Sequence, residues 1–382
     1  MAGLFAGIGG IELGFQSSAL DVETTMLCEW WEPARAVLEA RFAGVPVAPD
    51  VRSLKSLPAA LDLVAAGFPC TDLSQAGMTA GIAGENSGLV AHVFRLLERR
   101  RRPVRWLVIE NVANMLALGR GEAMHYLTDQ LSALGYRWAY RLVDSRFTGV
   151  PQRRRRVILV ASATEDPRPV LFSDDAGEPP AERYADDAFG FYRTEGLRGI
   201  GWAQDAVPTL KGGSTIGIPS EPAIWVPDNE VGRQFVMPTI NDGEALQGFP
   251  RGWTEPALAA GRLGHRWKLV GNAVTVGVAH WLGDRLAAPG DGYAADEELW
   301  SGPGAWPGAA WGEGEKVWRV RISEYPRLAE YEHLRDLVDV AAAPVVSFKS
   351  IDGFRRRLFG GNLGRHPGFR EAVVAHGAAL DT

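Results

Sequence analysis

Cysteine is scarce in this chain of 382 residues, since Cys28 and Cys70 are the only two. Two cysteines exclude a disulfide framework and a cysteine-rich zinc cluster, so each thiol has to be judged by itself. No apolar run approaches the roughly eighteen residues that a membrane span needs, and the N-terminus shows no charged leader followed by an apolar stretch and a cleavage site. We therefore expect a cytoplasmic protein without a metal site.

An excess of positive charge is also absent, because 46 acidic residues outnumber 40 basic ones and the net charge is −6. Taken as a sum, this argues against a nucleic-acid partner, since phosphate contacts need clustered Lys and Arg. The distribution matters more. Acidic residues concentrate in 165–187, whereas arginines cluster in 99–102, 153–156 and 355–357. An acidic surface can surround a basic site, so DNA stays an admissible partner.

From Leu4 to Ser162, short apolar runs bounded by turn signals alternate with helix-like segments. This pattern is typical of a parallel sheet covered by helices. The expected strands are 24–28, 61–65, 106–109, 138–143 and 157–161, and the expected helices are 11–16, 33–42, 89–99 and 122–134. We predict a doubly wound, Rossmann-like α/β domain whose ligand site lies beyond the carboxyl ends of the strands.

Beyond residue 164 the texture changes to Pro, Gly and Asp clusters with short strand-like pieces such as 223–226, which indicates a small, irregular β-rich domain. Regular character returns near Leu246 and continues into an apolar helical stretch, 270–286. The expected parts are a catalytic domain in 1–163, the small domain in 164–236, a return segment in 237–287 that completes the catalytic domain, and a linker with a C-terminal extension of unassigned role in 288–382.

A glycine-rich turn, Phe5 to Gly10, follows the first strand and precedes a helix, so the backbone can approach a nucleoside cofactor closely. A nicotinamide-dependent oxidoreductase would use the same architecture, but its third fingerprint glycine is replaced here by Glu12. Glu29 ends the second strand, where a carboxylate can accept hydrogen bonds from ribose hydroxyls. Asp50 stands where a third strand would end and could meet an adenine amino group. For each acid, a solvated surface position is the alternative.

Cys70 follows Pro69 in a loop after the strand 61–65, where loop amides or a helix start would favour the thiolate. An isolated cysteine is more often an inert buried side chain, and Cys28, inside an apolar strand, is interpreted in that way. Glu110 ends the next strand, so its carboxylate would point to the same edge of the sheet and suit proton donation. A helix cap or a surface acid is the alternative for Glu110.

The run Gln152 to Arg156 immediately precedes a strand, in which alternate side chains face opposite sides. Arg154 and Arg156 are therefore expected to share one face. A charge run is usually a solvated patch. Because the other motifs are also present, we expect these arginines to bind a base carbonyl or a phosphate.

Together these residues resemble the DNA cytosine-5 methyltransferase family, across roughly Leu4 to Ser162 and again from Met237 to Leu282, with the motifs in family order and spacing. The resemblance implies methyl transfer from S-adenosylmethionine to carbon 5 of cytosine in a specific double-stranded DNA sequence. It further implies base flipping, a covalent Cys70 intermediate, S-adenosylhomocysteine as product and a target recognition domain in 164–236. The implied catalytic residues are Cys70, Glu110, Arg154 and Arg156. The implied cofactor contacts are Phe5, Gly7, Ile8, Gly9, Gly10, Glu29, Trp30, Asp50, Val51, Pro69, Asn272 and Ala273.

The chain departs from the family pattern at a few positions. Thr71 follows the cysteine where the family usually has Gln, and Asn241-Asp242 stands where Arg-Glu is common, so a scaffold contact is expected to be altered. The first strand is short because the chain starts almost at the glycine turn. The tail beyond Asp284 exceeds the compact family members.

Several alternatives stay open at this point. Cytosine methylation in structured RNA would predict little or no inserted recognition domain, and the departures at Thr71 and Asn241-Asp242 would suit a sequence-specific DNA binder that has lost activity. A monomer is expected, with a cognate restriction endonuclease that acts separately. Arg355 to Arg357 either touch DNA backbone or form a solvated basic face.

Overall fold

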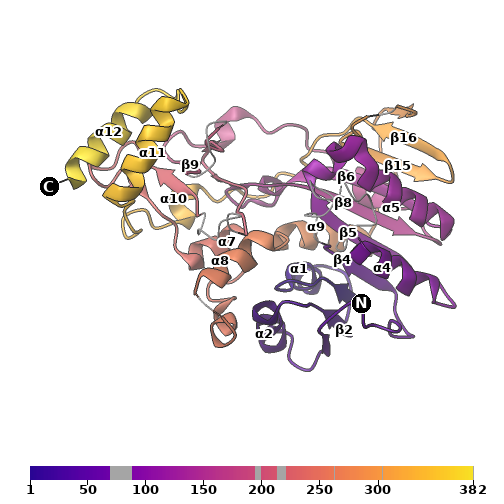
Figure 1. The fold of residues 1–382 in the computed structure, drawn as a ribbon. Coiled ribbons are helices and arrows are strands. Elements are labelled where there is room, and N and C mark those ends of the chain that lie inside the picture. The colour runs from indigo at the N-terminus through magenta and orange to yellow at the C-terminus, as the bar shows by residue number, and fades with distance from the viewer. Residues whose placement is uncertain (69–87, 194–198, 213–220, 262, 303, 382) are drawn as a thin grey trace. The chain divides into compact units, whose positions relative to one another are not determined.

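The structure of the protein is a computed structural model that describes all residues except 69–87, 194–198, 213–220, 262, 303 and 382 (Figure 1). Contacts within the chain divide it into two compact units. Unit 1 consists of Met1–Thr148, Arg155–Glu178 and Ala273–Leu328, and unit 2 consists of Gly149–Arg154, Pro179–Asn272 and Ala329–Thr382.

Unit 1 is built on a ten-stranded sheet in the order β14-β16-β15-β6-β8-β5-β4-β1-β2-β3. Its strands are β1 Ala2–Leu4, β2 Met26–Cys28, β3 Val47–Ala48, β4 Leu63–Ala66, β5 Trp106–Val112, β6 Arg137–Asp144, β8 Arg155–Ser162, β14 Glu297–Leu299, β15 Ala309–Glu313 and β16 Lys316–Val320. All five expected strands are present, and each overlaps its predicted range.

The sheet is mixed rather than parallel throughout, which corrects the expectation from sequence. Strands β5, β4, β1, β2 and β3 are parallel to one another, whereas β8 is antiparallel to both β5 and β6. The physical reason is the length of the connection between β6 and β8. Residues 145–154 are fewer than the dozen or more that a parallel crossover needs.

Helices cover both faces of this sheet, as predicted for a doubly wound domain (Figure 1). They are α1 Gly10–Ser17, α2 Glu32–Arg41, α4 Gly88–Glu98, α5 Glu122–Ala133, α6 Arg168–Phe172 and α9 Val276–Ala287. Along β5, Leu107 and Ile109 pack in one core with α4 and α5, while Trp106 and Val108 pack in a second core with α1, α6 and α9. Alternate strand side chains therefore anchor both layers.

The expected helix over 270–286 is interrupted. One helix, α8, spans Leu263–Asn272 in unit 2, and α9 begins at Val276 in unit 1, with Thr275 as its extended N-cap residue. Val274 and Thr275 are β-branched, which lowers their helix propensity, and Thr is a favoured residue at the start of a helix.

Unit 2 contains a four-stranded sheet in the order β10-β9-β12-β13 and a short parallel pair, β11 with β7. The strands are β7 Gln152–Arg153, β9 Phe189–Phe191, β10 Ala203–Gln204, β11 Val207–Pro208, β12 Ala223–Trp225 and β13 Phe235–Val236. The helices of this unit are α7 Ile240–Leu246, α8, α10 Leu334–Leu337, α11 Phe348–Gly360 and α12 Phe369–Leu380. A small β-rich part was expected here, but without these helices.

The C-terminal tail serves both units, which the boundaries expected from sequence did not anticipate. Strands β14 to β16 extend the large sheet, because β15 pairs with β6. Helices α11 and α12 cover the small sheet, where Phe354 and Phe369 pack against Phe191 and Phe235. Residues 237–272 also belong to unit 2. None of the helices in the described part of the chain is long and apolar enough to cross a membrane.

Candidate active site

The glycine-rich turn between β1 and α1 has an unusual backbone. Phe5, Gly7 and Gly9 have φ values of 56°, 57° and 82°, in the left-handed region. A Cβ atom on Gly9 would overlap the ring of Phe42, so glycine is required there on two grounds. A phenylalanine in this region is strained by about 1–3 kcal/mol, and such strain is concentrated at functional sites. Ile8 and Gly10 are buried beneath the turn.

Glu29 is held rigidly at the end of β2 by the turn itself. Its Oε2 accepts a hydrogen bond from the Gly7 amide at 2.9 Å, and its Oε1 accepts one from the Trp31 amide at 2.9 Å. Burial raises the pKa of Glu29, and the amide hydrogen bonds oppose that rise. A carboxylate has about four lone-pair directions, more than the backbone amides of Gly7, Trp30 and Trp31 occupy. Beside it, the Trp30 side chain is 66% exposed and offers an aromatic face.

Asp50 follows β3 at the same edge of the sheet. Its carboxylate pairs with Arg52, whose Nη2 lies 2.8 Å from Oδ2, and this hydrogen-bonded contact lowers the pKa of Asp50. The acid is therefore kept ionised as a hydrogen-bond acceptor. The next residue, Val51, is buried in the core.

Glu110 and Arg156 meet on neighbouring strands. The Oε1 atom of Glu110 lies 2.9 Å from the Nε atom of Arg156, and the two side chains are 11% and 12% exposed. Glu110 lies within β5 rather than after it, since the strand pairs with β8 as far as Val112. A Cβ atom on Gly67 would lie 3.8 Å from Glu110 Oε2 and 3.9 Å from the carbonyl oxygen of Phe5. The ends of β1, β4 and β5 thus converge.

The chain that leaves β4 is fixed beside this ion pair. The Nδ2 atom of Asn111 donates a hydrogen bond to the carbonyl of Phe68 at 3.3 Å, and the Oδ1 atom of Asn111 accepts one from the Val112 amide at 2.9 Å. Pro69, Cys70 and Thr71 come next and lie outside the described residues. Cys28, the other cysteine, is buried in β2, and burial raises the pKa of its thiol to about 12. The prediction that Cys28 is a buried side chain in a strand is confirmed.

Arg154 does not share a face with Arg156, contrary to the expectation from sequence. Its guanidinium is 1% exposed and donates hydrogen bonds to the carbonyls of Leu210, at 3.1 Å, and Gly271, at 3.3 Å. Both partners belong to unit 2. The expected alternation of side chains does not apply here, because β7 ends at Arg153 and β8 begins at Arg155. No continuous strand therefore carries both Arg154 and Arg156.

Asn272 and Ala273 fall on either side of a unit boundary. Asn272 ends α8 in unit 2, exposed and next to the backbone of Gly212, whereas Ala273 is buried in unit 1. Within unit 1, the glycine turn, Glu29, Trp30 and Asp50 lie at the carboxyl ends of parallel strands, and Glu110 lies in β5 beside the end of β4.

Comparison with known proteins identifies the family. Residues 1–186 match the C-5 cytosine-specific DNA methylase family. The type II methyltransferase M2.BsuMI of Bacillus subtilis (strain 168) is 46% identical over 366 residues, which cover 93% of this chain and 92% of that protein. The chain belongs to the C-5 cytosine-specific DNA methylase family. This methylase therefore transfers a methyl group to carbon 5 of cytosine in DNA, and its family uses S-adenosylmethionine as the methyl donor.

More distant relatives agree with this assignment of the methylase. The type II methyltransferase M.MspI of Moraxella sp is 25% identical over 303 residues, which cover 74% of this chain and 69% of that protein. Among solved structures, the Dnmt2 methyltransferase of S. pombe has a TM-score of 0.56 at 16% identity and covers 75% of this chain and 98% of its own. At that identity the likeness concerns the fold.

The Asn241-Asp242 departure leaves the methylase with a hydrogen-bonded scaffold. Asp242 forms a capping box with Thr239, and its carboxylate also pairs with Arg251. The Oδ1 atom of Asn241 accepts a hydrogen bond from Arg266 at 3.3 Å. The spacing of Thr239 and Asp242 is a helix-start signal that the sequence analysis could have used.

A buried acid, Glu12, lies under the glycine turn, and the sequence alone did not indicate its structural role. Glu12 is buried in α1, and its Oε1 packs directly on the backbone of Gly3. Its Oε2 has no hydrogen-bond partner within the described part of the methylase. Burial raises the pKa of Glu12 from 4.5 to about 7. The residue that breaks the dinucleotide fingerprint is therefore a carboxyl group that the folded protein prefers to keep neutral.

Glu12 should make the stability of the methylase depend on pH. The unfolded chain releases the Glu12 proton near pH 4.5, whereas the folded chain holds it to about pH 7. The resulting contribution to stability is complete below pH 4.5 and is lost as the pH rises through 7, to a total of about 3 kcal/mol. We expect Glu12→Gln to remove most of this dependence in urea unfolding at pH 5 and pH 8. An unchanged difference between the two pH values in Glu12→Gln would contradict the assignment.

Proposed function

We propose that the methylase flips the target cytosine out of duplex DNA and forms a covalent bond between Cys70 and carbon 6 of the base. Carbon 6 is not open to attack within the base stack, so the base has to leave it. The observation that carries the proposal is the Glu110–Arg156 ion pair beside Gly67 and Phe68, where the chain enters the segment of Cys70. An acid, a cation and the last described residues before Cys70 thus lie together at one strand end.

The proposed reaction gives each residue a defined step. The Cys70 thiolate forms a bond to carbon 6, Glu110 in its protonated form donates to nitrogen 3, and Arg156 donates a hydrogen bond to oxygen 2 as charge develops on the ring. Carbon 5 becomes nucleophilic and forms a bond to the methyl carbon, whose bond to the donor sulfur would break so that S-adenosylhomocysteine leaves. A base then takes the proton from carbon 5, the carbon 5–carbon 6 double bond re-forms as the Cys70 sulfur leaves as thiolate, and nitrogen 3 returns its proton to Glu110.

The cofactor site is proposed on the glycine turn and its neighbours. S-adenosylmethionine supplies an electrophilic methyl carbon when bound. Glu29 is suited to the ribose hydroxyls because backbone amides fix its carboxylate, Trp30 offers a face to the adenine ring, and the ionised Asp50 can accept from the adenine amino group. The family motifs add Pro69, Asn272 and Ala273 to the same set.

Unit 2 is proposed to read the DNA sequence, with Arg154 as a positioning residue rather than a contact to the base. Gln152 and Arg154 connect the segment that ends at Gly212, the last described residue before 213–220, to the ends of α7 and α8. The Oε1 atom of Gln152 accepts from the Leu210 amide at 3.0 Å, and its Nε2 donates to the Leu246 carbonyl at 2.9 Å. Lys211, with its Nζ atom 4.4 Å from the ring centre of Tyr192, is positioned by these contacts.

Replacing Arg154 with methionine should destabilise unit 2. The change leaves the buried carbonyls of Leu210 and Gly271 without a donor, and each such loss costs about 1–3 kcal/mol. We expect a lower midpoint of urea unfolding, together with a raised KM for DNA and a smaller change in kcat. A large fall in kcat with unchanged KM and unchanged stability would instead make Arg154 a catalytic residue.

The direct test is to express the methylase in cells and sequence their DNA after bisulfite treatment, which reports the product and the recognition sequence together. Labelled methyl incorporation into duplex DNA and transfer RNA should favour DNA strongly, because the chain carries a substantial second unit. Tight DNA binding without turnover would indicate an inactive binder. Since M2.BsuMI and M.MspI are type II methyltransferases, we also propose a separately acting endonuclease as the cognate partner. We further propose a monomer at the nucleoid in the cytoplasm.

A further inference from the structure

A basic surface of unit 1 has no role in the mechanism above. Segments 51–61 and 95–105 together contain eight basic residues and one acidic residue, in a chain whose net charge is −6. Loop 51–61 precedes β4, and segment 95–105 joins the end of α4 to the start of β5. Positive charge is therefore concentrated where two connections of the same unit come together.

Backbone carbonyls hold several of these guanidinium groups in place. The Nη2 atom of Arg95 donates to Leu54 at 3.0 Å, Nη1 of Arg99 donates to Lys55 at 3.3 Å, and Nη1 of Arg100 donates to Pro58 at 2.7 Å. A carbonyl orients a guanidinium but leaves its net charge intact. These hydrogen bonds thus hold the loop against the end of α4, and the arginines keep their positive charge.

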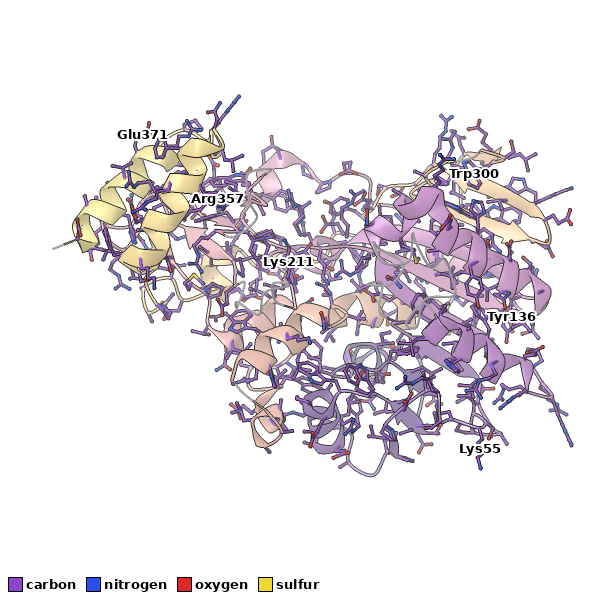
Figure 2. The ribbon with its side chains drawn as sticks, viewed as in Figure 1. Lys55, Tyr136, Lys211, Trp300, Arg357 and Glu371 are labelled. Atoms are coloured by element: carbon purple, nitrogen blue, oxygen red, sulfur yellow. The ribbon has the colours of Figure 1, made fainter. Side chains whose placement is uncertain are left out.

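Carboxylate partners are few around this surface. In the described part of these two segments, only Arg52 and Arg105 pair with acids, namely Asp50 and Glu165. We call Lys55, Arg99, Arg100, Arg101 and Arg102 the basic patch. All of its members except the half-buried Arg100 are exposed, and Figure 2 shows Lys55 on the outside of unit 1.

The basic patch lies away from the proposed active site within the same unit. Residues 99–102 precede β5, so they lie at the amino ends of the parallel strands, whereas Glu110 lies toward the other end of β5. A strand rises by about 3.3 Å per residue, so the four steps from Trp106 to Glu110 alone span about 13 Å. A base beside Glu110 is therefore beyond the reach of the patch.

The chemistry of the patch favours phosphate over a protein surface. The core of a protein interface is rich in aromatic and apolar side chains. None of the exposed large hydrophobic residues of the described chain falls in either segment. We propose that the basic patch is a second contact for the DNA backbone, independent of sequence, which holds duplex outside the segment that enters the active site. The proposal rests on DNA as the substrate of this methylase.

The test uses a variant that removes three exposed charges, Lys55→Gln with Arg101→Gln and Arg102→Gln. None of these three side chains makes a hydrogen bond or ion pair with another described residue, so folding should be unaffected, which thermal unfolding checks. Binding to duplex DNA of random sequence is measured over a range of salt concentrations. Each phosphate contact contributes about −0.9 to the slope of log affinity against log salt, so the slope should shrink by about two to three. Affinity at low salt should fall by about 10- to 100-fold.

A control removes the same number of charges elsewhere in unit 1, with Lys316→Gln, Arg319→Gln and Arg321→Gln on and after β16. Because Arg319 and Arg321 pair with Glu298, thermal unfolding checks the folding of this variant as well. The control should leave the slope unchanged. Equal effects in the two variants, or none in the patch variant, would overturn the proposal. So would a lower kcat at saturating DNA in the patch variant, because the patch would then belong to the active site. If the unmodified chain binds DNA but does not methylate it, the proposed mechanism fails while the slopes remain interpretable.

Discussion

Cys70→Ala should abolish methyl transfer, with a loss of kcat on the order of 10⁶-fold, the scale seen when a covalent nucleophile is removed from an enzyme. Carbon 5 of cytosine gains its nucleophilic character only after sulfur adds to carbon 6. Labelled methyl incorporation into DNA measures the loss. Duplex DNA that contains 5-fluorocytosine provides a second readout, because fluorine cannot leave as a proton and the protein–DNA bond is retained.

Cys28→Ala is the matched control for Cys70→Ala. The Cys28 thiol is buried in β2 and its raised pKa, about 12, keeps it protonated. The Cys28→Ala variant should therefore retain kcat and still form the adduct with fluorinated DNA. Its stability should fall only modestly. Cys70→Ala should bind DNA and the methyl donor normally. Product or adduct formed by Cys70→Ala at the normal rate would refute the covalent mechanism.

The sequence predicted the parts of the site that depend on local order. The turn from Phe5 to Gly10 and the acid Glu29 belong to adjacent parallel strands, so their meeting follows from a pattern of strand, turn and helix. Glu110 was likewise predicted at the correct edge, because β5 is a clear apolar run next to β4. In these cases burial and periodicity determine where a side chain points.

The sequence did not predict contacts that depend on distant segments. Arg154 was assigned to the same face as Arg156 from a period of two, but its partners, Leu210 and Gly271, lie far along the chain. The pairing of β15 with β6 also joins residues about 170 positions apart, and no local pattern specifies it. Strand direction was recoverable in one place, because the connection 145–154 is too short for a parallel crossover.

Glu110→Gln is expected to lower kcat by about 10²- to 10⁴-fold, the usual contribution of a positioned general acid. Glutamine has nearly the same shape, so the substitution removes the carboxyl proton without emptying the site. DNA affinity and the melting temperature should change little. Single-turnover methyl transfer at saturating DNA is the measurement. A variant that binds DNA poorly but reacts at the normal rate would assign Glu110 to binding.

The contact between Glu110 and Arg156 adds a sharper test of the same prediction. Residues in contact show interaction energies of about 0.5–3 kcal/mol in a double-mutant cycle, whereas distant residues are nearly additive. Because Glu110 Oε1 and Arg156 Nε lie 2.9 Å apart, the combined change Glu110→Gln with Arg156→Gln should lower kcat by less than the product of the single effects. Strict additivity would mean that the two side chains act on the base independently, and that their ion pair does not organise the site.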